Sequence, residues 1–125
     1  MSRSFLALAF AMAMTLCLHV FGGGPQYSEP FGTILPEGDL RVMGWVLWHA
    51  VTVVLGVLAL AYLRLAVRPN RDLLAFTTLL QLGWAGLFLT GGILWLDNLW
   101  IQPQWVLFLG FPLLAHLFAR RQARS

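Results

Sequence analysis

A largely apolar run of 24 residues, Val42 to Leu65, constrains the fold of this chain more than any other stretch. An α-helix rises about 1.5 Å per residue, so about 20 residues cross the ~30 Å hydrocarbon core of a bilayer. Lipid offers no partner for backbone N–H and C=O groups, and a helix satisfies both within itself. The run therefore predicts a transmembrane helix.

Three further apolar runs occupy most of the remaining chain. We expect helices at about residues 5–21, 42–65, 72–95 and 103–119, with an outer loop at 22–41. A content of 59% hydrophobic and 10% charged residues is typical of a membrane protein. Four such helices and their connections use all of residues 1–125 and leave no room for a soluble domain. The sequence predicts one all-α domain, a polytopic membrane protein with four transmembrane helices in an antiparallel bundle.

The first apolar run also has the form of a secretory signal peptide, because Phe5 to Phe21 follows the single basic residue Arg3. No pair of small residues closes the run. Leu16 stands where a lipoprotein signal would have a small residue before Cys17. We expect the helix to be retained, with a cleaved leader as the alternative.

Gly22, Gly23, Gly24 and Pro25 follow that run and are predicted to end the helix, since glycine admits left-handed backbone and proline cannot continue a helix. The stretch from there to Arg41 contains two more prolines and three acidic residues. We expect an extramembrane loop there. Loops this long inside a small domain are often functional.

The charged residues orient the four expected helices. The side that holds both termini collects seven of the eight basic residues, namely Arg3, Arg64, Arg68, Arg71, Arg120, Arg121 and Arg124. The opposite side holds Arg41 with Glu29, Glu37, Asp39 and Asp97. The positive-inside rule therefore predicts cytoplasmic N- and C-termini. We expect the cytoplasmic arginines to meet anionic headgroups of the lipid bilayer, and because they fall in three short segments, they do not indicate a nucleic-acid partner.

A polar intramembrane cluster is expected beneath the outer surface. His49 should lie ~10 Å deep, level with Thr15, and His19 about 6 Å higher. His49 could bind haem or a metal, relay a proton, or hydrogen-bond to Thr15. A metal with ~2 Å bonds to both imidazoles needs them level. No cofactor is therefore predicted, and haem or a metal at His49 remains the alternative, with His19 the only other candidate ligand.

Thr52 and Gln81 complete this cluster near the middle of the membrane. An amide in hydrocarbon needs hydrogen bonds, and interhelical ones contribute roughly 0.6 to 2 kcal/mol. Gly83 and Gly86 lie next to Gln81 and leave room for a close neighbour. We predict that the second and third helices pack through Thr52 and Gln81.

Three segments carry a resemblance to known proteins: His-Val-Phe-Gly-Gly-Gly-Pro at 19–25, Leu-Trp-His-Ala-Val-Thr at 47–52 and Pro-Gln-Trp-Val-Leu-Phe at 103–108. With these segments the chain resembles an uncharacterised group of small four-helix bacterial inner-membrane proteins. The resemblance implies placement in a bacterial inner membrane, and it implies no activity. It also draws attention to His19 and His49 and to an outer-face motif, which comprises Gly22, Gly23, Gly24, Pro25, Trp48 and Gln104.

Several classes of function lack the residues they need. The single cysteine, Cys17, excludes thiol-redox chemistry by a cysteine pair, and every acidic residue lies at a helix end or in a loop, unlike the embedded carboxylate of multidrug antiporters. The chain has no nucleophile-and-base motif, phosphate loop or zinc-ligand spacing. The sequence favours a non-enzymatic accessory or interaction subunit, or a small homo-oligomer, that associates through small-residue faces of the first and third helices. The alternative is a small transporter or a haem- or metal-binding redox protein that uses His49, with or without His19.

Overall fold

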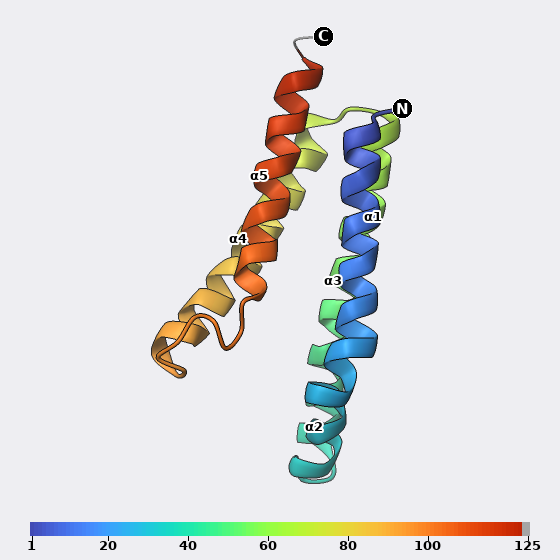
Figure 1. The fold of residues 1–125 in the computed structure, drawn as a ribbon. Helices are drawn as coiled ribbons and strands as arrows, with labels where there is room; N and C mark the ends of the chain where they lie inside the picture. The colour runs from blue at the N-terminus through green and yellow to red at the C-terminus, as the bar shows by residue number, and fades with distance from the viewer. Residues whose placement is uncertain (124–125) are drawn as a thin grey trace. The chain divides into compact units, whose positions relative to one another are not determined.

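The computed structural model describes residues 1–123, which form helices joined by short connections (Figure 1). In chain order the elements are α1 (Arg3–Cys17), the π-helix η1 (Leu18–Ser28), α2 (Glu29–Ile34), α3 (Asp39–Val67), α4 (Arg71–Leu94) and α5 (Gln104–Gln122). The all-α class is confirmed. Three segments are long and apolar enough to cross a membrane: Arg3–Ile34, Asp39–Val67 and Arg71–Leu94. A fourth span at α5 stays a prediction.

The predicted end of the first helix at Gly22 to Pro25 is wrong, and so is the predicted loop at 22–41. α1, η1 and α2 follow one another from Arg3 to Ile34, and only residues 35–38 separate α2 from α3. In a π-helix the hydrogen bonds connect residues five apart, and glycines have no side chain to crowd the wider backbone. The reversal of direction occurs instead around Gly38, whose φ of 97° favours glycine.

The chain divides into two compact units. The first unit is Leu6–Leu63, and the second unit consists of Met1–Phe5 together with Arg64–Ser125. Each unit is built around an antiparallel pair of helical segments.

In the first unit, the segment through η1 and α2 runs antiparallel to α3. His19 contacts Trp48, and Leu35, further along the chain, contacts Gly44, which comes earlier in α3. The turn between the two segments is closed by Arg41. Its Nη2 donates to the Leu35 carbonyl at 3.2 Å, and its Nη1 lies 3.7 Å from Glu37 Oε1.

In the second unit, α4 and α5 are antiparallel and bury facing stripes of side chains. The buried residues are Leu74, Thr77, Gln81, Ala85 and Gly92 on α4 and Phe108, Phe111, Pro112 and Ala115 on α5. Most recur every three or four positions, which is the spacing of one helix face. Asn70 caps the start of α4, because its Oδ1 accepts a hydrogen bond from the Leu73 N–H at 2.9 Å.

Gly92 lets the connection after α4 approach the helix. A Cβ at this position would lie 2.9 Å from Leu99 Cδ2 and 3.4 Å from the backbone Cα of Leu99. We expect Gly92→Val to lower the free energy of unfolding by about 1–2 kcal/mol, as overpacking does in a filled interior. Denaturant titration in detergent micelles measures the effect. The matched control is Gly110→Val, where no atom lies within 4 Å of the new Cβ, and an equal loss there would contradict the steric explanation.

Candidate functional site

Five rings from η1 and α3 form what we call the ring cluster of the first unit: His19, Tyr27, Trp45, Trp48 and His49. The imidazole of His19 stacks on the Trp48 indole with ring centroids 4.1 Å apart and an interplanar angle of 21°. Tyr27 approaches the same indole at 6.3 Å, and Trp45 lies 4.4 Å from His49 in a tilted arrangement. Trp48 therefore joins α3 to η1 through both His19 and Tyr27.

Gly23 is the member of the glycine triplet that this packing requires. A Cβ on Gly23 would lie 3.0 Å from Cη2 of Trp48, whereas Gly22 and Gly24 have no atom within 4 Å of the corresponding position. Pro25 is exposed. Within the predicted outer-face motif, the structure thus brings Gly23 and Trp48 into contact.

The backbone carbonyl of Trp48 is a shared hydrogen-bond acceptor. His19 Nε2 lies 3.4 Å from this oxygen, and the Thr52 hydroxyl donates to it from one turn further along α3 at 3.5 Å. Since a carbonyl only accepts, the bond assigns the proton of neutral His19 to Nε2 and leaves the lone pair on Nδ1. Both distances are at the long end for hydrogen bonds, so the ring stacking contributes much of what fixes His19.

The two imidazoles contact different tryptophans. The expected height of His19, about 6 Å above His49, was counted from a first helix that ends at Phe21. The helical segment continues to Ile34, so the height can no longer be counted from Phe21. His19 instead packs on Trp48, the residue immediately before His49. Successive residues of an α-helix point about 100° apart, so His49 faces Trp45. Among residues 1–123, no group of three His, Cys, Asp or Glu side chains is arranged to hold a metal ion.

Each of the other predicted polar residues makes a hydrogen bond to a backbone carbonyl of its own helix. Thr15 Oγ1 donates to the Ala11 carbonyl at 2.9 Å, whereas a bond to His49 was one of the predicted alternatives. The buried Gln81 donates from Nε2 to the Thr77 carbonyl at 2.9 Å. Thr52 and Gln81 belong to different units, and their pairing stays a prediction.

Gln104, the last member of the outer-face motif, starts α5 and therefore belongs to the second unit. Its Oε1 is buried and accepts no hydrogen bond from the part of the chain that the structure describes. The outer-face motif is thus divided between the units, with its glycines, Pro25 and Trp48 in the first.

One polar contact was missed by the sequence reasoning. Thr78 Oγ1 and His116 Nε2 lie 3.1 Å apart and link α4 to α5. Thr78 also donates to the Leu74 carbonyl at 2.8 Å. Two polar residues on consecutive predicted helices, Thr78 and His116, were a hint that a hydrogen bond joins the helices. Pairing them required the exact register of the hairpin.

The geometry of the ring cluster suits packing and hydrogen bonding more than catalysis. Trp48 occupies one face of His19, and the Trp48 carbonyl occupies Nε2. The Nδ1 lone pair of His19 and the imidazole of His49 are the groups left for proton exchange or ligand binding. A histidine that acts as a general base is often oriented by a carboxylate, and in the described part of the chain neither imidazole contacts one.

Comparison with known proteins found no family model, no curated protein and no solved structure that matches the chain.

Proposed function

We propose that this chain is an integral membrane protein that acts by association, either as a non-enzymatic accessory subunit of another membrane protein or as a small homo-oligomer. The observation that carries the proposal is the open face of α4. Gly83 and Gly86 are exposed, and no atom lies within 4 Å of the position that a Cβ on either would take. Gly83 lies in a shallow groove on α4 that is also lined by Leu79, Leu80, Trp84 and Leu87.

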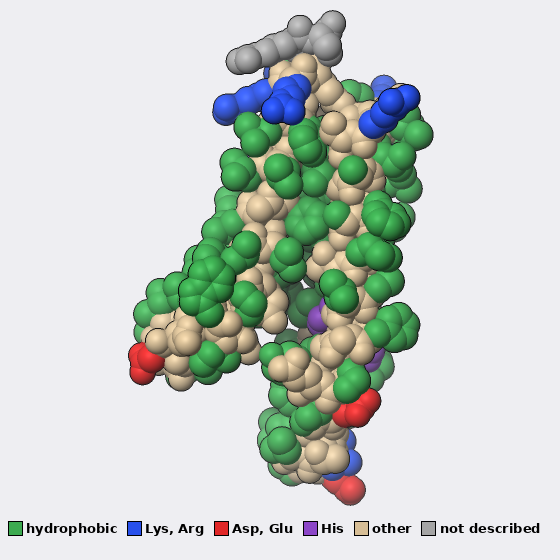
Figure 2. All heavy atoms as spheres, viewed as in Figure 1, with side chains coloured by type: hydrophobic (Ala, Val, Ile, Leu, Met, Phe, Trp, Pro, Cys, Tyr) green, Lys and Arg blue, Asp and Glu red, His purple; other side chains and the backbone are tan. Residues whose placement is uncertain are grey.

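Such a groove suits a second transmembrane helix. Lipid tails are as apolar as leucine, so helices in a membrane associate by close packing, and small residues allow the backbones to approach. Ala7 and Ala11 are also exposed and lie one turn apart on α1. Exposed hydrophobic side chains occur along the helices on the face shown in Figure 2, as expected for contact with lipid or a neighbouring helix.

The proposed location is a bacterial inner membrane with both termini cytoplasmic. Three membrane-length helices support a membrane location. α5 has 19 residues and is about 28 Å long at 1.5 Å per residue, close to the ~30 Å of the hydrocarbon core. With α5 as the fourth span, the arginine distribution supports the orientation, and the resemblance noted above supports the bacterial inner membrane.

Cross-linking in native membranes tests the homo-oligomer. In a Cys17→Ala background, we expect Gly86→Cys to form a disulfide-linked dimer on mild oxidation, since a bond between two copies of one engineered cysteine requires two chains. The matched control is Leu113→Cys, which is 63% exposed on α5 and lies outside the groove. We expect at least fivefold less dimer from it at equal expression.

Native mass spectrometry in mild detergent tests the accessory subunit. A second polypeptide should remain with the 14.0 kDa chain, and Gly83→Leu, which fills the groove, should release it. A bare monomer that also gives no dimer from Gly86→Cys above the Leu113→Cys control would contradict both forms of the proposal.

The alternative is a small transporter or a haem- or metal-binding redox protein that uses His49, with or without His19. The observation that favours it is the Nε2 hydrogen bond of His19, which leaves Nδ1 with its lone pair. Metal analysis and the visible spectrum of the purified chain test this alternative. One haem or metal per chain, lost on His49→Ala in a protein of unchanged helicity, would support it over association alone.

A further inference from the structure

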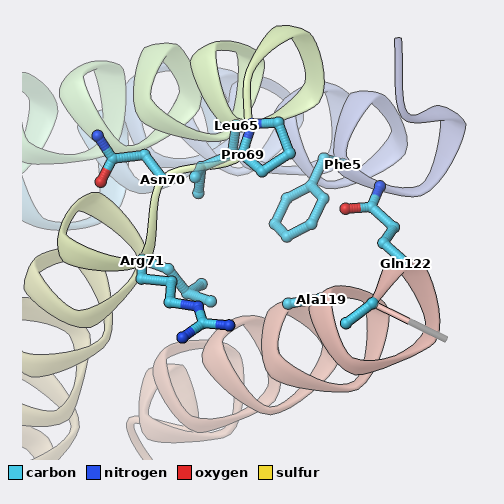
Figure 3. Close-up of a pocket in the computed structure, with 9 residues that line it drawn as sticks. Phe5, Leu65, Pro69, Asn70, Arg71, Ala119 and Gln122 are labelled. Atoms are coloured by element: carbon cyan, nitrogen blue, oxygen red, sulfur yellow. The ribbon is translucent and has the colours of Figure 1, made fainter.

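The second unit contains a cavity of about 250 Å³ where α1 begins, α3 ends, α4 begins and α5 ends (Figure 3). Phe5, Leu65, Leu74 and Ala119 give it a largely apolar lining, and Arg71 and Gln122 add polar groups. Figure 3 shows the Phe5 ring and the Arg71 side chain projecting toward the same space from opposite sides. The cavity is thus amphipathic.

The apolar walls are fixed by the fold. The Ser2 N–H donates to the Ala66 carbonyl at 2.7 Å and ties the start of the chain to the last turn of α3. Ser2 Oγ accepts from the Phe5 N–H at 3.5 Å, a long capping interaction at the start of α1. Phe5 and Leu65 are only 2% and 3% exposed. Because these side chains are already held in place, a ligand that enters the cavity loses little free energy to ordering them, which favours binding.

This end of the second unit is strongly basic. Its described arginines are Arg3, Arg64, Arg68, Arg71, Arg120 and Arg121, and none of them forms an ion pair within residues 1–123. Asp72 is the acidic residue nearby in the sequence. The planar guanidinium of arginine matches phosphate oxygens with two parallel hydrogen bonds. The arginines therefore complement a phosphate group, and the apolar lining complements an apolar chain attached to it.

We propose that this cavity binds one anionic phospholipid. Arg71 holds the phosphate, Gln122 adds a polar contact, and the glycerol and first methylene groups lie over Phe5, Leu65 and Leu74. The cavity of about 250 Å³ has room for part of a headgroup and leaves the acyl tails in the bilayer. Basic pockets between transmembrane helices are known to bind lipid headgroups in this way. The site is separate from the α4 groove and does not depend on association.

Native mass spectrometry of the full chain, titrated with phosphatidylglycerol and with phosphatidylcholine, tests the proposal. One phosphatidylglycerol should bind at least fivefold more tightly than phosphatidylcholine. Arg71→Gln should weaken phosphatidylglycerol binding about fivefold, the effect of one basic residue near an anionic headgroup. Arg68→Gln removes an equal charge at the same end but outside the lining, and it should change binding less than twofold.

A second variant tests the cavity itself. Ala119→Leu leaves every charge in place and puts a larger side chain into the lining, so the folded variant should bind phosphatidylglycerol at least threefold more weakly. Circular dichroism establishes whether it is folded, and if it is not, the two arginine variants decide. Equal binding of the two lipids, equal losses from Arg71→Gln and Arg68→Gln, or full affinity in folded Ala119→Leu would overturn the proposal.

Discussion

Phe108→Ala is expected to lower the free energy of unfolding of the protein by about 2–3 kcal/mol in detergent micelles. Phe108 is 5% exposed, and its ring stacks with Trp84 at 6.0 Å and with Phe88 at 5.9 Å, so it joins α5 to two turns of α4. Truncation deletes both ring pairs, each worth about 0.5–1.5 kcal/mol, and leaves a void between the helices. The expected loss is below the ~3–5 kcal/mol of soluble cores, because the surrounding lipid or detergent is also apolar.

Denaturant titration monitored by tryptophan fluorescence and circular dichroism measures this loss. Leu113→Ala is the matched control, because Leu113 lies on the same helix and is 63% exposed. It should change the free energy of unfolding by less than about 0.5 kcal/mol. If Phe108→Ala costs no more than the control, the stacked rings do not hold the α4–α5 pair together.

Much of the helical architecture could be predicted from the sequence, because lipid admits few alternatives. An apolar run of membrane length must satisfy its own backbone hydrogen bonds, so it forms a helix. The expected helix at 72–95 differs from α4 (Arg71–Leu94) by one residue at each end. Its start is marked by Asn70, which caps the helix, and the side-chain cap is a local signal that a sequence shows directly.

The continuous helix from Arg3 to Ile34 could not be read in the same way. Glycine and proline break helices in water, but in transmembrane helices neighbouring side chains and local changes of helical pitch accommodate them. Here the relevant neighbour is Trp48, whose ring lies against Gly23 and His19. These residues are more than twenty positions away in the sequence, so no local pattern reports the contact.

The candidate site also depends on contacts between residues that are far apart in the sequence. The sequence singled out Trp48 and His49 as residues of one helix, because the apolar run that contains both is of membrane length. The depth of His49 in the membrane stays a prediction. The sequence could not assign His19 to Trp48, since that register depends on where the chain turns and on the helical pitch of η1. Correct partners between helices require both quantities.

Trp48→Ala is expected to lower the free energy of unfolding by about 2 kcal/mol and to reduce the helicity of η1. Trp48 is half-buried, and its indole supplies the stacking surface for His19, the contact with Tyr27 and the close approach to Gly23. The substitution removes all three contacts and retains the Trp48 carbonyl. The triplet of glycines and Pro25 then has to maintain a π-helix on backbone hydrogen bonds alone, in the residues least suited to a helix.

A double-mutant cycle with His19→Ala separates the ring stacking from other effects of these substitutions. We expect a coupling free energy of about 1 kcal/mol between the two positions, the scale measured for neighbouring aromatic rings.

Trp95→Ala is the matched control, because Trp95 is 78% exposed and lies outside the ring cluster. It should leave the helicity unchanged and show no coupling to His19. If the losses in free energy of unfolding from Trp48→Ala and His19→Ala are additive, the stacked rings do not hold η1 against α3. The π-helix is then stabilised by interactions within residues 18–28. If they are coupled, the contact with α3 maintains the helix through the glycine triplet.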